Sequence, residues 1–330
     1  MREIRFGVVG LGMGHNRAVL ISRTPGARLV AVCDLDEARC RRTAAATGCA
    51  WTQDYKELLA RDDIDVIQVM VPSGMHARFG IEAARAGKHV VTTKPIEVTL
   101  EAADRLIAAC REAGVMLAVD FEYRYIPAVA KVKRAIDAGA FGKLVLGEVS
   151  LKWYRSQAYY DASGWRGTWK YDGGGSLMNQ TVHDIDVLLW WMGRPRWVVG
   201  HTSINTHKIE TEDLGMAMIE FENGAKGRIL GTTTHPVQRP VVKEVHGDKL
   251  GASIVGDELT WFVPEGASAP DIPYDGPANI VEDVVGALNE GRDPLVTGEE
   301  GRRSLELITA IYRSAAERRP VEFPISETRS

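Results

Sequence analysis

The stretch Ile4–His15, IRFGVVGLGMGH, decides the fold of the first half of the chain. It begins with a short apolar run, Ile4–Val9, that ends at a glycine, which is typical of a buried parallel strand. Three glycines follow within five residues, and a helical pattern begins at Ala18–Ile21. In such a strand–turn–helix unit, backbone N–H groups and the helix dipole meet at one point, where they favour an anion such as a pyrophosphate.

An acidic residue follows the second predicted strand at a defined spacing from the glycine turn. A second strand pattern, Leu29–Cys33, ends at Asp34, 22 residues beyond Gly12. Dinucleotide-binding proteins place a carboxylate at this spacing on the 2′-hydroxyl of the adenosine ribose. Because a carboxylate there repels a 2′-phosphate, NAD is favoured over NADP; the simpler role of Asp34 is that of a turn residue. The strict glycine pattern would also have glycine where His15 stands, so a shortened turn is expected.

Strands and helices continue to alternate as far as residue 119. The expected elements are strands Asp65–Val71, His89–Thr92 and Val115–Val119 and helices Met75–Ala86 and Glu101–Ala113. This alternation predicts an α/β, doubly wound parallel sheet, in which ligands bind at the carboxyl ends of the strands. The cofactor contacts expected there are Gly10, Gly12, Met13, Gly14, Asp34, Val71, Pro72, Ser73, Thr93, Lys94 and Glu122, with Tyr123 and Arg124 toward a substrate.

From about Tyr123 the pattern changes to that of an α+β domain. A helix over Ala128–Ala138 precedes a strand over Leu144–Trp153, and an aromatic-rich irregular stretch, Tyr154–Tyr171, follows. Further strands are expected at Trp197–Asn205, Leu214–Glu220, Ala225–Thr232 and Val241–His246, and closing helices at Pro277–Asn289 and Gly298–Ala316. Asn223-Gly224 is a strong hairpin signal, so this sheet should be mostly antiparallel. The predicted domains are residues 1–122 and 123–330, with the last helices near the first domain.

The stretch Gly173–Asp186, GGGSLMNQTVHDID, has the residues of a reaction site. Helical periodicity from Ser176 to Met192 brings Asn179, His183 and Asp186 to one side of a helix. An amide, an imidazole and a carboxylate then follow directly on a glycine-rich loop. In the irregular stretch before it, aromatic rings such as Tyr159 offer flat apolar faces to a sugar ring, or they pack against the sheet.

Composition excludes several classes of protein. The net charge of −4 gives no reason to expect nucleic acid as a partner, and no apolar run approaches the roughly 20 residues that span a bilayer. The four cysteines form no metal spacing, which indicates reduced thiols and a cytoplasmic protein. No metal ligands are expected, since the histidines of the second half lie in or near strands without ligand spacing: His201, His207, His235 and His246.

Several segments together resemble the Gfo/Idh/MocA oxidoreductase family, the glucose–fructose oxidoreductase and inositol dehydrogenase group. They occur in the family's order from about residue 4 to about residue 324: FGVVGLGMGH, VMVPSGMHA, AGKHVVTTKPIEVTLEAA, FEYRYIPAV, GGGSLMNQTVHDIDVLLWWMG and VTGEEGRRSLELITAIYRSA. The resemblance implies a Rossmann domain followed by a large open sheet that packs against another subunit, in a homodimer or homotetramer. It is specific for the family and not for one sugar or cyclitol.

The resemblance also implies roles for particular residues. The family's Glu-Lys-Pro signature falls on Thr93-Lys94-Pro95, so Lys94 matches the catalytic lysine while Thr93 departs from glutamate. The family's aspartate–histidine pair falls on Asn179 and His183, and an amide cannot accept a proton as a carboxylate can. Asp186 matches an acidic position with a structural role. Further matches lie beside the cofactor and substrate: Trp165, Arg166 and His76, the last with packing of its helix as the alternative.

The expected reaction is reversible hydride transfer between a secondary alcohol of a sugar or cyclitol and NAD. His183 is the expected acid/base, because an imidazole has an unperturbed pKa of about 6.5. Lys94 is expected on the same oxygen, and Asn179 is expected to position His183 or a second hydroxyl of the substrate. A carboxylate partner for the imidazole would be Asp184 or Asp186. Two alternatives remain: a non-catalytic NAD-binding sensor, and a redox-assisted enzyme that cleaves glycosides.

Overall fold

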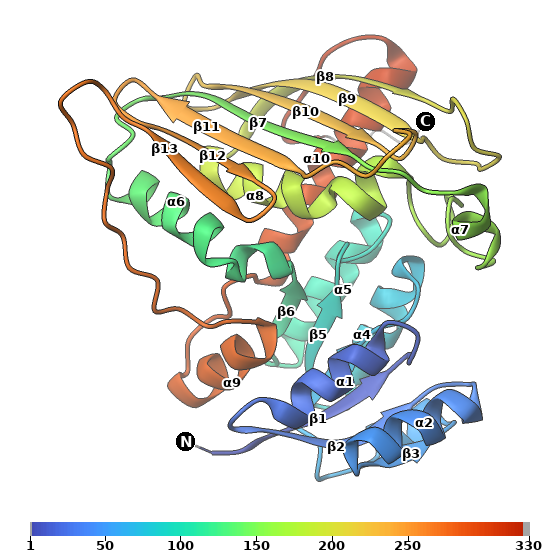
Figure 1. Ribbon diagram of the computed structural model, residues 1–330. Coiled ribbons are helices and arrows are strands. Elements are labelled where there is room, and N and C mark those ends of the chain that lie inside the picture. The colour runs from blue at the N-terminus through green and yellow to red at the C-terminus, as the bar shows by residue number, and fades with distance from the viewer. Residues whose placement is uncertain (1, 326–330) are drawn as a thin grey trace. The chain divides into compact units, whose positions relative to one another are not determined.

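The computed structural model describes residues 2–325, which divide into two compact units (Figure 1). The first unit contains the chain up to Phe121 together with Pro277–Arg302, and the second contains Glu122–Gly276 and the chain from Arg303. The predicted division into domains 1–122 and 123–330 concerns independent folding and stays a prediction. Each unit is built around its own sheet.

The first unit holds a six-stranded sheet in the order β3-β2-β1-β4-β5-β6, and every pair of neighbours is parallel. Its strands are β1 (Ile4–Val9), β2 (Ala27–Cys33), β3 (Ala50–Thr52), β4 (Val66–Val69), β5 (His89–Thr93) and β6 (Leu117–Asp120). Its helices are α1 (Gly14–Arg23), α2 (Glu37–Thr47), α3 (Tyr55–Leu59), η1 (Ser73–Met75), α4 (His76–Arg85), α5 (Leu100–Glu112) and α9 (Ile280–Glu290). The strand order reverses between β1 and β4, which confirms the predicted doubly wound sheet and marks where ligands bind in such folds.

Apolar burial explains why most strands of this sheet were predicted from the sequence and why β3, which has no buried residue, was not. In β4 all four residues are buried, so the strand is a continuous apolar run apart from Gln68. In α2 only Cys40 and Thr43 are buried, and three arginines face solvent or partners outside the core. Helix α2 is therefore held by its ends, with Asp36 accepting from the Arg39 N–H at one end and Gly48 in a left-handed conformation at the other.

The second unit holds an eight-stranded sheet in the order β13-β12-β11-β7-β10-β9-β8-β14. Its strands are β7 (Leu144–Lys152), β8 (Pro195–Ser203), β9 (Leu214–Phe221), β10 (Lys226–Thr232), β11 (Val242–Gly247), β12 (Gly251–Val255), β13 (Glu258–Phe262) and β14 (Val321–Glu322). Only β7 and β10 pair in parallel among these neighbours, so the predicted, mostly antiparallel sheet is confirmed. The Asn223-Gly224 turn joins β9 to β10, and Gly224 takes the positive φ of 83° that such turns need.

Helices cover one face of this sheet (Figure 1). They are α6 (Pro127–Asp137) and α8 (Val182–Met192). The other helices introduced here are η2 (Glu122–Tyr125) before α6, α7 (Gln157–Asp161) and η3 (Ser176–Thr181) between α6 and α8, and α10 (Gly298–Glu317) near the end of the chain. Within α8 every residue except Trp190 is buried. None of the helices in residues 2–325 is long and apolar enough to cross a bilayer.

The predicted helix Ser176–Met192 needs one correction. Its first six residues, Ser176–Thr181, form a π-helix, and α-helical geometry begins only at Val182. The Thr181 hydroxyl donates to the Ser176 carbonyl, five residues back, at 2.7 Å. Such wide turns are often found at functional sites because they re-aim side chains along a helix.

The opposite face of the sheet carries exposed apolar side chains. On β9, Met216 is 46% and Met218 is 62% exposed. In register beside them on the same face lie Leu230 and Arg228 of β10 and Val199 and His201 of β8. Exposed apolar side chains on an open sheet face, mixed with polar ones, indicate an interaction surface in a globular protein. We expect a second copy of the chain to cover it.

If a second copy covers this face, Met218→Glu should shift the protein from oligomer to monomer, because each copy would bury a charge against apolar side chains. Size-exclusion chromatography with light scattering measures this directly. Val237→Glu is the matched control, since Val237 is 56% exposed outside the strands of the sheet. A monomeric wild type at micromolar concentration, or an unchanged oligomer in the Met218 variant, would contradict the expectation.

Candidate functional site

The glycine turn after β1 is shaped for close approach of a ligand. Gly10 has a φ of 88°, and a Cβ there would lie 2.7 Å from the Met70 carbonyl carbon and oxygen. Gly12 is different: a Cβ there would meet only a guanidinium nitrogen of Arg39, at 4.0 Å. The first glycine is thus required by the protein's own backbone, while the second leaves open space beside the amino end of α1. This cradle fits the pyrophosphate of a dinucleotide.

Asp34 stands where the ribose of a dinucleotide is recognised in such folds. One carboxylate oxygen accepts from the Leu11 N–H at 2.6 Å, and the other accepts from the Asp36 N–H at 2.9 Å. The carboxylate therefore ties the end of β2 to the glycine turn. A guanidinium nitrogen of Arg39 lies 3.9 Å from it, on a side chain that is 47% exposed. Asp34 and Arg39 thus offer a hydroxyl acceptor and a phosphate partner side by side.

The loops after β4 and β5 are joined by the buried side chain of His76. Its two ring nitrogens lie 3.0 Å from the Val71 carbonyl and 2.8 Å from the Pro95 carbonyl. Burial lowers the pKa of His76, which favours the neutral ring in spite of these two acceptors. The ring holds the segment with Pro72 and Ser73 against the segment that contains Lys94, which is half-buried and followed by a cis peptide bond to Pro95. These contacts show a packing role for His76, and its position beside a cofactor stays a prediction.

In the second unit, the glycine run before η3 is clamped by Glu212. One carboxylate oxygen accepts from the Gly175 N–H at 2.9 Å, and the other accepts from the Leu177 N–H at 2.8 Å and the Tyr312 hydroxyl at 3.0 Å. A Cβ at Gly175 would lie 1.8 Å from the Glu212 carbonyl oxygen, so only glycine fits. Burial raises the pKa of Glu212 to about 7.

His183 lies at the first turn of α8 and is 8% exposed. Its ring stacks on Tyr123 of η2, with centroids 4.6 Å apart and an angle of 27° between the planes. The Nε2 atom is 3.9 Å from a carboxylate oxygen of Glu122, whose side chain is 60% exposed. A ring held by stacking, with one nitrogen toward a solvated carboxylate, can gain and lose a proton without moving.

The two carboxylates that follow His183 have other partners. Asp184 pairs with Lys243 of β11 at 2.9 Å, and Asp186 accepts two hydrogen bonds from the Arg124 guanidinium, at 2.7 and 2.8 Å. All four side chains are at most 4% exposed. The buried pairing gives Asp186 the structural role that the resemblance implied. Arg124, which was expected at the substrate, is 2% exposed and is the partner of Asp186 in this pair.

Asn179 has a carboxylate neighbour that the sequence did not reveal. Its amide nitrogen donates to Asp172 Oδ1 at 2.5 Å, and the other oxygen of Asp172 accepts from the Gly167 N–H at 2.8 Å. Asp172 is 2% exposed, whereas Asn179 is half-buried. Seven positions separate the two residues, but the glycine run between them is not helical, so no helical pattern in the sequence predicted their contact.

The irregular segment before the glycines carries two arginines stacked on Tyr159. The guanidinium carbons of Arg166 and Arg155 lie 4.3 and 5.2 Å from the centre of its ring. Trp165 is half-buried with Arg166 over its ring at 5.5 Å, and the Tyr159 hydroxyl accepts from Gln180 of η3 at 3.3 Å. Among residues 2–325 neither arginine has a carboxylate partner, and the Nε atom of each is buried without a hydrogen bond.

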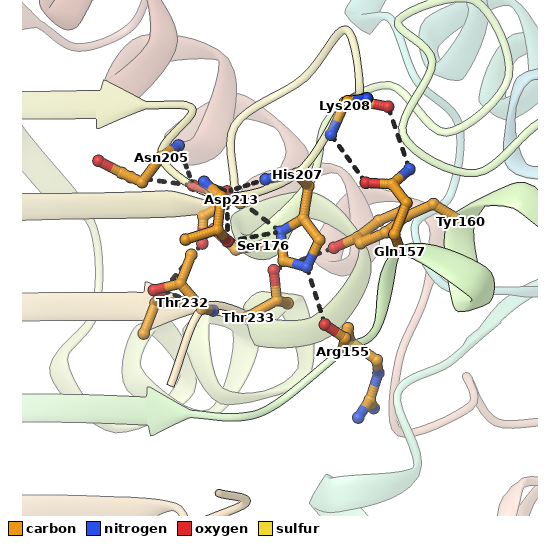
Figure 2. Close-up of polar contacts among 12 residues, drawn as sticks. Arg155, Gln157, Tyr160, Ser176, Asn205, His207, Lys208, Asp213, Thr232 and Thr233 are labelled. Atoms are coloured by element: carbon orange, nitrogen blue, oxygen red, sulfur yellow. Dashed lines mark hydrogen bonds and ion pairs between the residues drawn. The ribbon is translucent and has the colours of Figure 1, made fainter. Parts of the chain in front are cut away.

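A second network holds this segment in place (Figure 2). The His207 ring bridges Asp213, at 3.1 Å from Nδ1, and the Arg155 carbonyl, at 2.8 Å from Nε2. Asp213 also accepts from the Asn205, Thr206 and His207 N–H groups. His207 therefore packs within this network, and the loop before β9 fixes the backbone at Arg155.

Each unit thus gathers a different half of the predicted residues. The first holds Gly10, Gly12, Gly14, Asp34, Val71, Pro72, Ser73, His76, Thr93 and Lys94 at the carboxyl ends of its strands, with Met13 71% exposed. The second holds Glu122, Tyr123, Arg124, Tyr159, Trp165, Arg166, Asn179 and His183 around η3. In the described part of the chain no group of three or more His, Cys, Asp or Glu side chains could hold a metal ion, and all four cysteines are free.

Comparison with known proteins identifies both units. Residues 4–121 match the model of the oxidoreductase family with an NAD-binding Rossmann fold, and residues 129–253 match the Gfo/Idh/MocA C-terminal domain. The scyllo-inositol 2-dehydrogenase (NAD(+)) of Bacillus subtilis is 27% identical over 98% of this chain and 97% of its own. The inositol 2-dehydrogenase of Rubrobacter xylanophilus is 32% identical over 79% of this chain and 72% of its own.

A solved structure is similar over the whole length. The WlbA dehydrogenase of Bordetella pertussis, in complex with NADH and UDP-GlcNAcA, has a TM-score of 0.91 and 34% identity, covering 98% of this chain and 100% of that one. Both the fold and the glycine turn of the first unit are therefore those of dinucleotide-binding oxidoreductases.

Asp34 and Arg39 together generate a test of cofactor choice. Asp34→Ser should raise the KM for NAD and lower that for NADP, because the repulsion of a 2′-phosphate disappears while Arg39 remains to contact it. The same substitution in an Arg39→Gln background should raise the KM for NAD without the gain for NADP. Steady-state kinetics with each cofactor measure both, and Asp62→Ser at an exposed site is the control. An unchanged preference in Asp34→Ser would place the ribose elsewhere.

Proposed function

The chain belongs to the Gfo/Idh/MocA oxidoreductase family, and from this premise we propose that it oxidises a ring secondary alcohol of a sugar derivative with NAD in the cytoplasm. The observation that carries the proposal is His183, which is stacked on Tyr123 beside Glu122 at the start of α8, directly after η3. When bound, the nicotinamide supplies the acceptor for the hydride that leaves the substrate carbon. The protein's part is to remove the hydroxyl proton and to hold the alcohol in place.

His183 is proposed as the base. As the C–H electron pair leaves with hydride, the O–H proton passes to the imidazole and the carbon–oxygen bond becomes a carbonyl. Glu122, 3.9 Å away, favours the resulting imidazolium, although its exposure limits this contribution to at most about 1 kcal/mol. The stacked Tyr123 keeps the ring orientation while the charge changes.

Lys94 is proposed to donate a hydrogen bond to the same substrate oxygen. A half-buried ammonium at the end of a parallel strand stabilises the negative charge that develops on that oxygen before the proton is transferred. His76 and Pro95 restrict the loop on which it stands. Thr93, in place of the family's glutamate, retains a hydroxyl beside it.

The charges of the second unit support an anionic sugar over a neutral cyclitol. Arg155 and Arg166 present two guanidinium groups without carboxylate partners among the described residues, each with a buried Nε left to donate. Uncompensated, partly buried cations of this kind suit a phosphate or a carboxylate. Tyr159 between them offers an aromatic face, and the WlbA dehydrogenase, 34% identical, was solved with a nucleotide-linked sugar acid. We therefore infer a sugar that carries phosphate or carboxylate groups.

Replacement of either proposed catalytic residue tests the reaction. Lys94→Ala and His183→Ala should each lower kcat by roughly 10²–10⁴, because each removes a group that acts on the reacting oxygen. The protein should still bind NADH, because the other expected cofactor contacts remain. NADH absorbance with UDP-GlcNAcA as first substrate and scyllo-inositol as second measures turnover, and fluorescence titration measures binding. Lys56→Ala and His235→Ala are controls outside the site. Near wild-type turnover in either catalytic variant would remove its assigned role.

A charge-selective effect on KM tests the substrate class. Arg155→Gln and Arg166→Gln should each raise the KM for UDP-GlcNAcA about 10–100-fold, since each removes a charge-assisted hydrogen bond, and should leave the KM for scyllo-inositol nearly unchanged. Arg105→Gln, at an exposed pair with Glu101 on α5, is the matched control. Equal effects on the charged and the neutral substrate would argue against an anionic sugar.

A further inference from the structure

The amide of Asn179 is held by a buried carboxylate. Its nitrogen donates to Asp172 Oδ1 at 2.5 Å, and Asp172 is 2% exposed with its second oxygen on the Gly167 N–H. Asn179 itself is half-buried and lies one turn before His183, on the π-helical segment η3. One side of this amide is thus assigned to the protein interior.

We propose that Asp172 is a positioning residue that orients the Asn179 amide, so that its oxygen faces the substrate, and that this neighbour is why position 179 carries an amide. The inference rests on the proposed dehydrogenase function for its catalytic part. Its structural part, the pairing of the two side chains, stands on the contacts alone.

The orientation follows from donor and acceptor chemistry. An ionised carboxylate only accepts hydrogen bonds, so the Asn179 side chain must turn its NH₂ group toward Asp172. The amide oxygen then lies on the other side of the plane, where it can accept from a substrate hydroxyl. Turning the amide by 180° would bring two acceptors together and take a donor away from a buried carboxylate oxygen, which costs about 1–3 kcal/mol.

The same neighbour disfavours aspartate at position 179. Two carboxylates at the distance of a hydrogen bond cannot both be ionised, so the pair would share one proton and one pKa would be raised. Asp172 is already buried, and the Gly167 N–H and the amide both donate to it. Asparagine keeps an acceptor toward the substrate and avoids this titration.

Other ionisable groups surround the pair. The Tyr160 and Tyr312 hydroxyls feel the charge of Asp172, and burial raises the pKa of Tyr160 to about 12 and that of Tyr312 well above its usual value, so both stay neutral in an assay. His183 follows on α8, and Glu212, whose pKa is about 7, hydrogen-bonds to Tyr312. Because Glu212 titrates in the assay range, each variant is compared with the wild type at every pH.

An exchange of the two side chains tests the inference. In Asp172→Asn the new amide oxygen retains the Gly167 N–H, so its NH₂ group faces that of Asn179, which must turn its oxygen inward. We expect kcat to fall about 10-fold or more, because the substrate then meets a donor in place of an acceptor.

In Asn179→Asp the loss should depend on pH. Below the raised pKa of the pair, a shared proton replaces the amide hydrogen and activity is retained. Above that pKa both carboxylates, at positions 172 and 179, are ionised and repel each other, so their side chains move apart. The ratio of variant to wild-type kcat should therefore fall as pH rises.

The double variant D172N/N179D should recover. The amide introduced at position 172 then donates to the carboxylate at position 179, whose second oxygen again faces the substrate as an acceptor. We expect kcat within about 3-fold of wild type, and the ratio of variant to wild-type kcat should not fall at high pH. If the two sites were independent, the loss in the double variant would instead be the product of the two single losses. The midpoint of thermal unfolding should drop in each single variant and recover in the double. Asp161→Asn, at an exposed carboxylate that accepts from the Gln157 amide at 2.9 Å, is the matched control.

The two proposals fail in different ways. If the wild type oxidises no sugar, the proposed function fails, while recovery of the unfolding midpoint still supports the pairing. If the wild type is active and the losses in the double variant multiply, the positioning role is overturned. Should Asp172→Asn not fold, an Asn179→Asp variant whose ratio to wild type is flat with pH would overturn it equally.

Discussion

The buried carboxyl of Glu212 is the contact on which the glycine turn into η3 depends. It accepts from two N–H groups of the turn into η3 and from Tyr312, and the Ser176 N–H donates to the backbone carbonyl oxygen of the same residue. The turn from the glycine run into a π-helix leaves its first N–H groups without helical partners, and a single residue supplies them. These hydrogen bonds stabilise the wide turn, and the turn sets the direction in which the Asn179 side chain leaves η3.

Charge is buried around His183 at considerable cost. The pairs Asp184–Lys243 and Asp186–Arg124 lie almost entirely out of water, where desolvation offsets much of their attraction. Loss of one partner from such a pair typically costs about 3–5 kcal/mol, so each pair locks α8 to the element that carries its partner. The backbone that carries the His183 imidazole is therefore held firmly, because Asp184 and Asp186 after it are both paired. The imidazole ring itself is stacked on Tyr123.

The sequence was informative where structure is local and silent where it depends on distant partners. Ile4–Val9, the glycine turn and Asp34 follow one another within a single βαβ unit, and both sheets were predicted from strand and turn patterns. The short strand β3 was missed because none of its residues is buried. The π-helix was missed because Glu212, which accepts hydrogen bonds from the turn into it, stands 36 residues beyond Ser176. Asp172 beside Asn179 follows from no helical spacing, since the glycine run lies between the two.

The position of a negative charge connects Asn179 with the two arginines. The family's aspartate would put a full charge against the substrate, whereas here the carboxylate of Asp172 lies behind a neutral amide. At an effective dielectric of about 20, two like charges repel by about 4 kcal/mol at 4 Å and by about half of that at twice the distance. For a substrate that carries phosphate or carboxylate groups toward Arg155 and Arg166, moving the charge back by one side chain removes part of this repulsion. The amide at position 179 and the two guanidinium groups stacked on Tyr159 thus favour the same class of anionic sugar.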